Sequence, residues 1–194
     1  MPQTVYITLL GKQGVGKTST DNRFHFGKFI EHYNPPISTS EIPNRVLKVL
    51  DHDISVEVLD VVGDDEFSFG EYDFIKKGEG FILFYAINSK KSYLQVQSKY
   101  NKILQIKDMM EEELPQKYCL VLCGNKIDLS CERTVEKGDG QDLANKLNAT
   151  FFEVSAKTGE RVDEMYNHIV YSVFLEKQKD FNTIKKKKKK CILM

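Results

Sequence analysis

A glycine-rich segment near the start of the chain carries residue types that can hold phosphate groups. Its sequence, GKQGVGKT over residues 11–18, fits the pattern G-x-x-x-x-G-K-[ST] at every fixed position. Glycines let successive backbone N–H groups turn toward phosphate oxygens, the Lys17 ammonium can reach the β- and γ-phosphates, and the Thr18 hydroxyl can bind Mg²⁺. We therefore predict a nucleotide phosphate site in this segment. The predicted site consists of Gly11, Lys12, Gln13, Gly14, Val15, Gly16, Lys17, Thr18 and Ser19.

Two later segments indicate which base accompanies the phosphates. The sequence NKID at 125–128 follows a predicted strand, and the Asp128 carboxylate can accept hydrogen bonds from both the ring N1–H and the exocyclic amine of guanine. Adenine offers no matching pair of donors, so a buried aspartate would reject it. The sequence SAK at 155–157 follows another predicted strand, where a backbone N–H can donate to the guanine 6-oxo group. The predicted base site consists of Asn125, Lys126, Asp128, Ser155, Ala156 and Lys157.

The elements that must position these motifs alternate between β-rich apolar runs and helical patterns. Three of the apolar runs have stretches that are apolar on both faces, which is typical of parallel strands covered by helices. This alternation predicts an α/β fold, a doubly wound and mostly parallel sheet of about six strands with helices on both faces. An antiparallel hairpin is expected to turn at residues 51–53. We expect strands at 5–11, 45–50, 54–63, 80–87, 119–126 and 150–156, and helices at 17–27, 65–77, 90–110, 138–147 and 161–177.

Length and composition indicate one globular domain. The chain has 194 residues, enough for a full core without disulfides or metals, and 41% of them are hydrophobic. Cys119 and Cys123 flank an apolar run, as is typical of reduced core thiols. We expect neither a secretion signal nor a membrane-spanning run. The net charge of +0 hides an asymmetry, because six consecutive lysines at 185–190 leave the rest of the chain with six more acidic than basic side chains.

Taken together, the motifs resemble those of the Ras superfamily of small GTPases, and of its Ras branch in particular. GKQGVGKT, DVVG, NKID and EVSAK stand in the family's order, and KKGEGFILFYAINSKKSY is similar to the Ras-branch segment between the second switch and the third helix. The resemblance covers roughly residues 4–178. It implies binding of GTP and GDP with Mg²⁺, with Phe29 stacked on the base. It also implies that Asp60 faces Mg²⁺ through a water molecule and that the Gly63 N–H reaches the γ-phosphate.

The chain departs from the family where the family handles the γ-phosphate. The position of Gln13 is usually glycine, and a side chain there crowds the entry of a partner's arginine finger, unless Gln13 points to solvent. The water-orienting glutamine would fall at Asp64, whose carboxylate accepts hydrogen bonds but cannot donate them. The threonine of the first switch is replaced by Pro36, which has neither a hydroxyl nor an N–H. The loop would have to slide to bring in a substitute hydroxyl from Ser38, Thr39 or Ser40.

The last residues, KKKKKKCILM, form a separate feature. Cys191 and the three residues after it fit the C-a-a-X pattern read by a prenyltransferase, and the terminal Met favours a farnesyl group. One lipid chain holds a membrane only marginally, and the lysines would add attraction to anionic lipids of the inner leaflet. A lysine run alone could also be a nuclear or nucleic-acid patch, but the adjacent C-a-a-X motif disfavours a nucleic-acid partner. We predict a guanine-nucleotide-binding domain at 1–177, a flexible tail at 178–194, and a location at the cytoplasmic face of the plasma membrane.

Three functions are compatible with these motifs. The first is a prenylated, membrane-tethered small GTPase that acts as a signalling switch with slow hydrolysis, in which Lys17 and Asp64 are the catalytic candidates. The second is a pseudo-GTPase that binds guanine nucleotide constitutively and acts as a scaffold. The third is a small-molecule kinase with a phosphate loop, against which the NKID and SAK segments and the lack of an evident lid argue. The motifs leave the effector and the exchange factor unknown.

Overall fold

The computed structural model describes residues 3–29, 44–60, 69–109 and 119–192, with side chains described as far as residue 179. Its strands are β1 (Gln3–Gly11), β2 (Arg45–Val49), β3 (His52–Asp60), β4 (Gly80–Ala86), β5 (Cys119–Asn125) and β6 (Thr150–Glu153). Its helices are α1 (Lys17–Phe26), α2 (Phe69–Lys77), α3 (Lys90–Leu94), α4 (Val96–Asp108), α5 (Lys137–Lys146) and α6 (Val162–Ile192), with a 3₁₀ helix at Ile127–Glu132.

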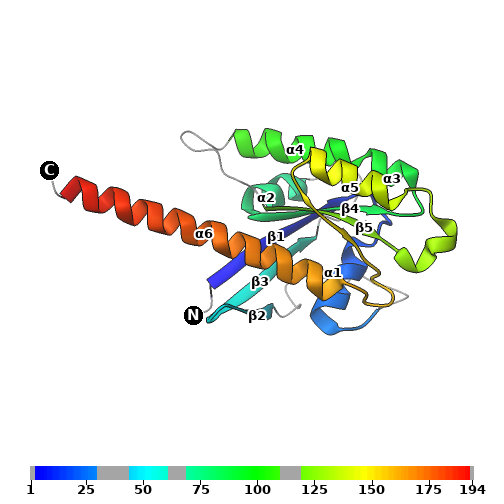
Figure 1. The fold of residues 1–194 in the computed structure, drawn as a ribbon, viewed down its shortest axis with the longest axis horizontal. Helices are drawn as coiled ribbons and strands as arrows, with labels where there is room; N and C mark the ends of the chain where they lie inside the picture. Colours follow the sequence, from blue (N-terminus) through cyan, green and yellow to red (C-terminus); the bar gives the residue numbers. More distant parts are fainter. Residues whose placement is uncertain (1–2, 30–43, 61–68, 110–118, 193–194) are drawn as a thin grey trace.

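The strands form one six-stranded sheet in the order β2-β3-β1-β4-β5-β6. All neighbouring pairs are parallel except β2 with β3, which form an antiparallel hairpin. Figure 1 shows helices on both faces of this sheet, so the predicted doubly wound α/β fold is confirmed. Because the parallel strands share one direction, their carboxyl ends meet at one edge of the sheet. The phosphate loop, Asp60 and the segments at 125–128 and 155–157 all follow or end strands at that edge.

The core has two parts because the sheet is covered on both faces. β4 is buried at every position, and its alternating side chains divide between the two parts. Ile82 and Phe84 pack in the part that contains Phe24 of α1 and Tyr166 of α6. The residues that alternate with them, Phe81, Leu83 and Tyr85, pack in the other part with side chains of α4 and α5. This burial explains why the strands read as continuous apolar runs in the sequence.

The hairpin turn and the helix predicted at 90–110 differ from the sequence-based prediction. The hairpin turns at Leu50 and Asp51, with Val49 opposite His52, so the predicted turn at 51–53 is displaced. Leu50 has a positive φ of 47°, a conformation that its side chain gives no reason to expect. The predicted helix at 90–110 is divided at Gln95 into α3 and α4. Ser89 caps α3, and its side chain accepts a hydrogen bond from the Ser92 N–H.

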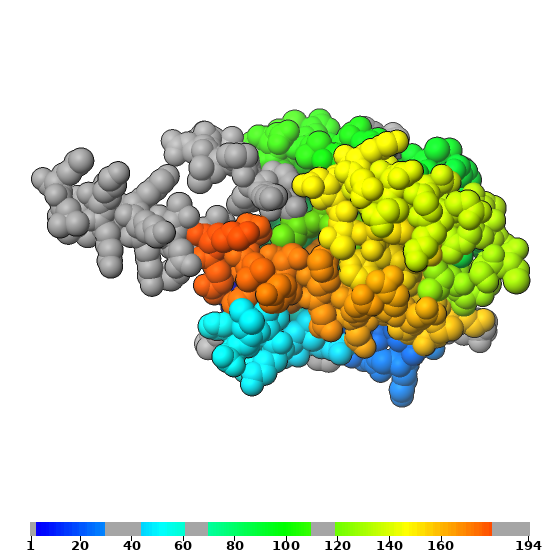
Figure 2. All heavy atoms as spheres, in the orientation of Figure 1, coloured from blue at the N-terminus to red at the C-terminus, as the bar shows by residue number. Residues whose placement is uncertain are grey.

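The last helix is longer than the predicted one. α6 runs from Val162 to Ile192, so the backbone is helical through most of the segment predicted as a flexible tail. That segment has no proline or glycine, and lysine has good helix propensity. Figure 2 shows the described side chains of α6 lying between the β2–β3 hairpin and the α5 region. Near the end of that part, Lys177 donates to the Thr4 carbonyl at 2.9 Å and pairs with Glu79 at 2.6 Å. None of the helices in the described part of the chain has the length and apolar character needed to cross a membrane.

Candidate nucleotide-binding site

The phosphate loop joins the end of β1 to the start of α1. Gly16 caps α1 with a left-handed φ of 95°, which places the first N–H groups of the helix at the loop. The Lys17 ammonium folds back across the loop and donates to the Gly11 carbonyl at 2.9 Å and to the Lys12 carbonyl at 3.4 Å. Lys17 is buried, so its charge lies inside the loop rather than in solvent. The strand, loop and helix follow one another as the sequence predicted, whereas the contact of Lys17 with phosphates stays a prediction.

Asn125 connects the phosphate loop to the base segments. Its Nδ2 donates to the Val15 carbonyl at 2.9 Å, and its Oδ1 accepts from the backbone N–H groups of Lys126 at 2.8 Å and Ala156 at 3.1 Å. A Cβ atom on Gly16 would lie 2.3 Å from this Nδ2, so the loop approaches Asn125 as closely as glycine allows. Asn125 is 1% exposed. A single buried amide therefore joins three segments that are far apart in the sequence.

Asp128 and Ser155, from the two segments predicted to hold the base, contact one another directly. The Ser155 hydroxyl donates to Asp128 Oδ1 at 2.6 Å and accepts from the Thr158 N–H at 3.1 Å. This contact fixes one carboxylate oxygen of Asp128, as selection of a base requires. Asp128 is exposed rather than buried, which corrects the expectation from the sequence. Its carboxylate can exclude adenine only when a bound base covers it.

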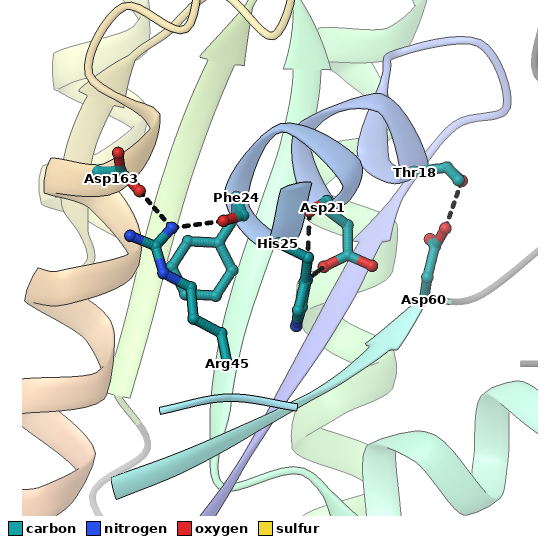
Figure 3. Close-up of polar contacts among 7 residues, drawn as sticks. All are labelled: Thr18, Asp21, Phe24, His25, Arg45, Asp60 and Asp163. Carbon is teal, nitrogen blue, oxygen red and sulfur yellow. Dashed lines mark hydrogen bonds and ion pairs between the residues drawn. The ribbon is translucent and has the colours of Figure 1, made fainter. Parts of the chain in front are cut away.

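A carboxylate that lacks a full set of partners lies beside the phosphate loop. The Thr18 hydroxyl donates to one oxygen of Asp60, while the other oxygen is buried and has no hydrogen-bond partner among the described residues (Figure 3). Burial raises the pKa of Asp60 to about 6 and the Asp21 charge adds to the rise, while the Thr18 hydrogen bond and the Lys17 charge oppose it. A buried carboxylate oxygen beside a hydroxyl is a donor set that suits Mg²⁺. The residues present therefore fit the predicted magnesium ion, which Thr18 and Asp60 would hold.

Comparison with known proteins agrees with this geometry. The sequence model of the Ras family matches residues 6–175. The chain belongs to the Ras family of small GTPases. It is 34% identical to Ras-like protein 2 of Mucor circinelloides f. lusitanicus over 86% of this chain and 80% of that protein. It is also 34% identical to Ras-like protein rasZ of Dictyostelium discoideum, over 96% of this chain and 82% of that protein. A third relative, Ras-like protein RAS2 of Hydra vulgaris, is 31% identical over 97% of this chain and 95% of its own length.

Membership of the Ras family establishes the general activity. Ras-family GTPases bind guanine nucleotide and hydrolyse GTP, and the chain is a GTPase of this kind. The phosphate loop, Asn125 and Asp128 lie where such a nucleotide would contact them, at the carboxyl edge of the sheet.

Two buried residues of this Ras-family site were not predicted from the sequence. Asp21 lies on the face of α1 toward the sheet, and its Oδ1 is 2.8 Å from Nδ1 of His25, one turn further along (Figure 3). Both side chains are less than a tenth exposed. Polar residues on α1 fit a solvated helix face equally well, so their sequence pattern carried no signal. Only the fold shows that Asp21 adds negative charge near Asp60.

The remaining predicted residues divide into described and undescribed ones. Gln13 is exposed, and Phe29 is half-buried, two residues after the Gly27 cap of α1. Gly63, Asp64 and the first-switch residues lie outside the described part of the chain. The side chain of Cys191 lies outside it as well, although its backbone belongs to α6. The roles given to all of these residues stay predictions.

Proposed function

We propose that the chain is a magnesium-dependent guanine-nucleotide switch with slow GTP hydrolysis, held at a membrane by its carboxyl-terminal segment. The observation that carries the nucleotide part is the Asn125 amide, which joins the phosphate loop to the 155–157 loop through hydrogen bonds of 2.9 and 3.1 Å. The segments that would contact the phosphates and the base are then joined by hydrogen bonds through one side chain. The nucleotide-binding domain would comprise residues 1–177, with 178–194 as the tether.

The residues of the phosphate loop define how the nucleotide would be held. The N–H groups at the start of α1 would bind phosphate oxygens, and Lys17 would exchange its loop carbonyls for the β- and γ-phosphates. Thr18 and Asp60 would hold Mg²⁺, which when bound neutralises charge on the β- and γ-phosphates. Asp128 would accept from the guanine ring, and Phe29 would cover the base. The Gly63 N–H would reach the γ-phosphate.

Slow hydrolysis is supported by the residue types at three positions near the γ-phosphate. Gln13 obstructs the route of an arginine finger, Asp64 cannot donate to the transition-state oxygens, and Pro36 lacks the switch hydroxyl. We expect intrinsic turnover at or below about 10⁻⁴ s⁻¹, with little gain from an activating protein.

A single-turnover assay of GTP-loaded protein tests this rate. The double substitution Gln13→Gly with Asp64→Gln should restore both the finger route and the water-orienting amide, and a Ras-family activating protein should then accelerate hydrolysis by about 10³-fold or more. Neither single substitution should suffice, because the two groups act in one transition state. Pro36→Thr should act separately, by tightening GTP relative to GDP. Rapid hydrolysis by the unmodified chain would contradict the proposal. Guanine nucleotide bound with no measurable turnover would instead identify a pseudo-GTPase scaffold.

Membrane attachment is supported by the sequence at the end of the chain. A prenyltransferase would attach a farnesyl group to Cys191, and the lysines at 185–190 would contribute about 1 kcal/mol each at an anionic leaflet. The cytoplasmic face of the plasma membrane is the location that offers such lipids. Cys191→Ser should move the protein from the membrane fraction to the soluble fraction. Replacing the lysines with glutamine should weaken binding to anionic vesicles while prenylation continues. A cysteine variant that stayed on membranes would place the anchor elsewhere.

A further inference from the structure

An arginine of α1 spans the gap between that helix and the loop predicted to hold the base. Arg23 lies in the last turn of α1, and its guanidinium donates to three backbone carbonyls. Nε donates to Ala156 at 2.9 Å, and one terminal nitrogen donates to Gly27 at 2.8 Å. The other terminal nitrogen donates to Lys157. Two of the three acceptors thus belong to residues 155–157, called the base loop below, and the third, Gly27, caps the end of α1.

The three acceptors require the shape of an arginine. A guanidinium presents its donors in a rigid plane, so one side chain can bond carbonyls on two segments at once. A lysine is a single point charge on a flexible stem and cannot reproduce this fork. Gly159, with a φ of +86°, turns the loop against the same group, since a Cβ placed there would lie 3.4 Å from Arg23 Cδ.

Arg23 also joins the two ends of the nucleotide site through α1. The helix begins at the phosphate loop and ends at Gly27, whose N–H donates to the Arg23 carbonyl at 2.9 Å. Phe29, the residue expected to stack on the base, follows two residues later. The other described side-chain anchors of the base loop, Asn125 and Asp128, come from the end of β5 and the segment after it. Arg23 therefore fixes the loop to the side of the site that carries Phe29.

We propose that Arg23 is a positioning residue that slows the release of guanine nucleotide by holding the 155–157 loop against the end of α1. The inference rests on the proposed function, because it requires that the loop contact a bound guanine. A base can leave only when the segments that cover it separate. Separation of this loop from α1 breaks both hydrogen bonds from Arg23 to Ala156 and Lys157. The barrier to release therefore includes those two bonds.

The size of the effect follows from the two lost hydrogen bonds. Net hydrogen-bond contributions correspond to about tenfold in rate when the bonds are partly exposed, as these are. GDP and GTP should be affected by the same factor, because the acceptors of Arg23 among the described residues lie at the base loop and the end of α1. Arg23→Gln and Arg23→Ala should both release nucleotide about tenfold faster than the parent. Arg23→Lys should lie between them and the parent, since one donor can reach one carbonyl.

Arg45, the first residue of β2, provides a matched control because it also contacts the end of α1. It donates to the Phe24 carbonyl, stacks on the Phe24 ring at 4.5 Å and pairs with Asp163 at 2.6 Å, without contacting the base loop (Figure 3). Arg45→Gln removes a comparable arginine contact to the end of α1. It should lower the thermal unfolding midpoint about as much as Arg23→Gln, while nucleotide release stays at the parental rate.

The experiment uses the full-length protein loaded with fluorescent GDP and chased with unlabelled GDP, with and without a chelator of Mg²⁺. The expected result is faster release for the Arg23 variants alone, by a factor that chelation leaves unchanged, because the base loop and the cation end contribute independently. Equal acceleration by Arg45→Gln, or parental release by Arg23→Ala, would overturn the inference. A parent that binds no guanine nucleotide would instead refute the proposed function, so the two failures are distinguishable.

Discussion

The two ends of the nucleotide site differ in how far the protein satisfies its own polar groups. At the base end, Asn125, Ser155 and Arg23 hold the 155–157 loop through hydrogen bonds to side chains and backbone. At the cation end, Asp60 receives one hydrogen bond from Thr18 and keeps a buried oxygen without a partner among the described residues. The base end is thus organised by the protein itself, whereas the cation end keeps a buried carboxylate oxygen that no described residue satisfies.

A second buried carboxylate, Glu71, is fully paired, so the missing partner of Asp60 is not a general feature of buried carboxylates in this protein. Glu71 on α2 is as buried as any side chain of the core, but it pairs with Lys99 at 2.8 Å and Lys102 at 2.5 Å on α4. Burial alone would raise the pKa of Glu71, yet the hydrogen bonds and charges of Lys102 and Lys99 outweigh burial and lower it. Asp60 has the opposite shift, because burial outweighs the Thr18 hydrogen bond and the charge of Lys17. Fully paired and under-paired carboxylates therefore lie in the same domain.

The largest expected effect comes from breaking the base end. Asp128→Asn should weaken GDP and GTP binding by about 10⁴-fold, because the site then opposes a donor to the guanine amine. Xanthine nucleotides should bind better than guanine nucleotides, since their ring presents an oxo group there. Competition against a fluorescent GDP, with ATP and a xanthosine diphosphate as competitors, measures both changes. Comparable affinity of the parent for ATP and GDP would refute the base-site assignment.

A substitution at the cation end should weaken nucleotide binding less and should not destabilise the protein without nucleotide. Asp60→Asn should weaken the Mg²⁺ dependence of nucleotide binding by about 10–100-fold. Stability without nucleotide should not fall, because the substitution removes a buried charge that burial disfavours and leaves an oxygen that accepts from Thr18. Nucleotide release measured against free Mg²⁺ gives the first quantity, and chemical unfolding of nucleotide-stripped protein gives the second. Loss of stability in the stripped protein would show that Asp60 is balanced by the protein after all.

Glu71 should give the smallest effect on nucleotide and a clear one on folding. Glu71→Gln should lower the free energy of unfolding by about 2 kcal/mol, since two partly buried lysines lose their shared partner. The affinity for GDP should stay unchanged. The folded pKa of Glu71 is depressed, so its contribution is present above pH 4.5 and is lost as the pH falls through the folded pKa. Unfolding curves of parent and variant should therefore converge in acid, and curves that stay parallel would contradict the pairing.

Much of this molecule is predictable from local sequence signals. The alternation of apolar runs with helical patterns predicted the α/β class and about six strands. The phosphate loop, Asn125 and Asp128 were identified from motif residues at fixed spacing. The turn at Leu50 was misplaced because a leucine with positive φ follows from pairing of Val49 with His52 rather than from turn chemistry. Arg23 was missed for a related reason. Two of its three acceptors lie 133 and 134 residues away, and nothing near it in the sequence distinguishes it from a solvated arginine.

The contact of Lys177 with Thr4 has a consequence for the time course of synthesis. β1 emerges first from the ribosome, but its neighbours β3 and β4 follow much later, and α6 comes last. Lys177 lies 173 positions after Thr4, so nearly the whole chain must be made before this hydrogen bond can form. A nascent chain therefore carries its central strand without the cover of α6 through most of translation, which exposes apolar surface to aggregation and to chaperones. Because α6 is made last, the proposed prenylation at Cys191 would act on a domain whose other elements are already complete.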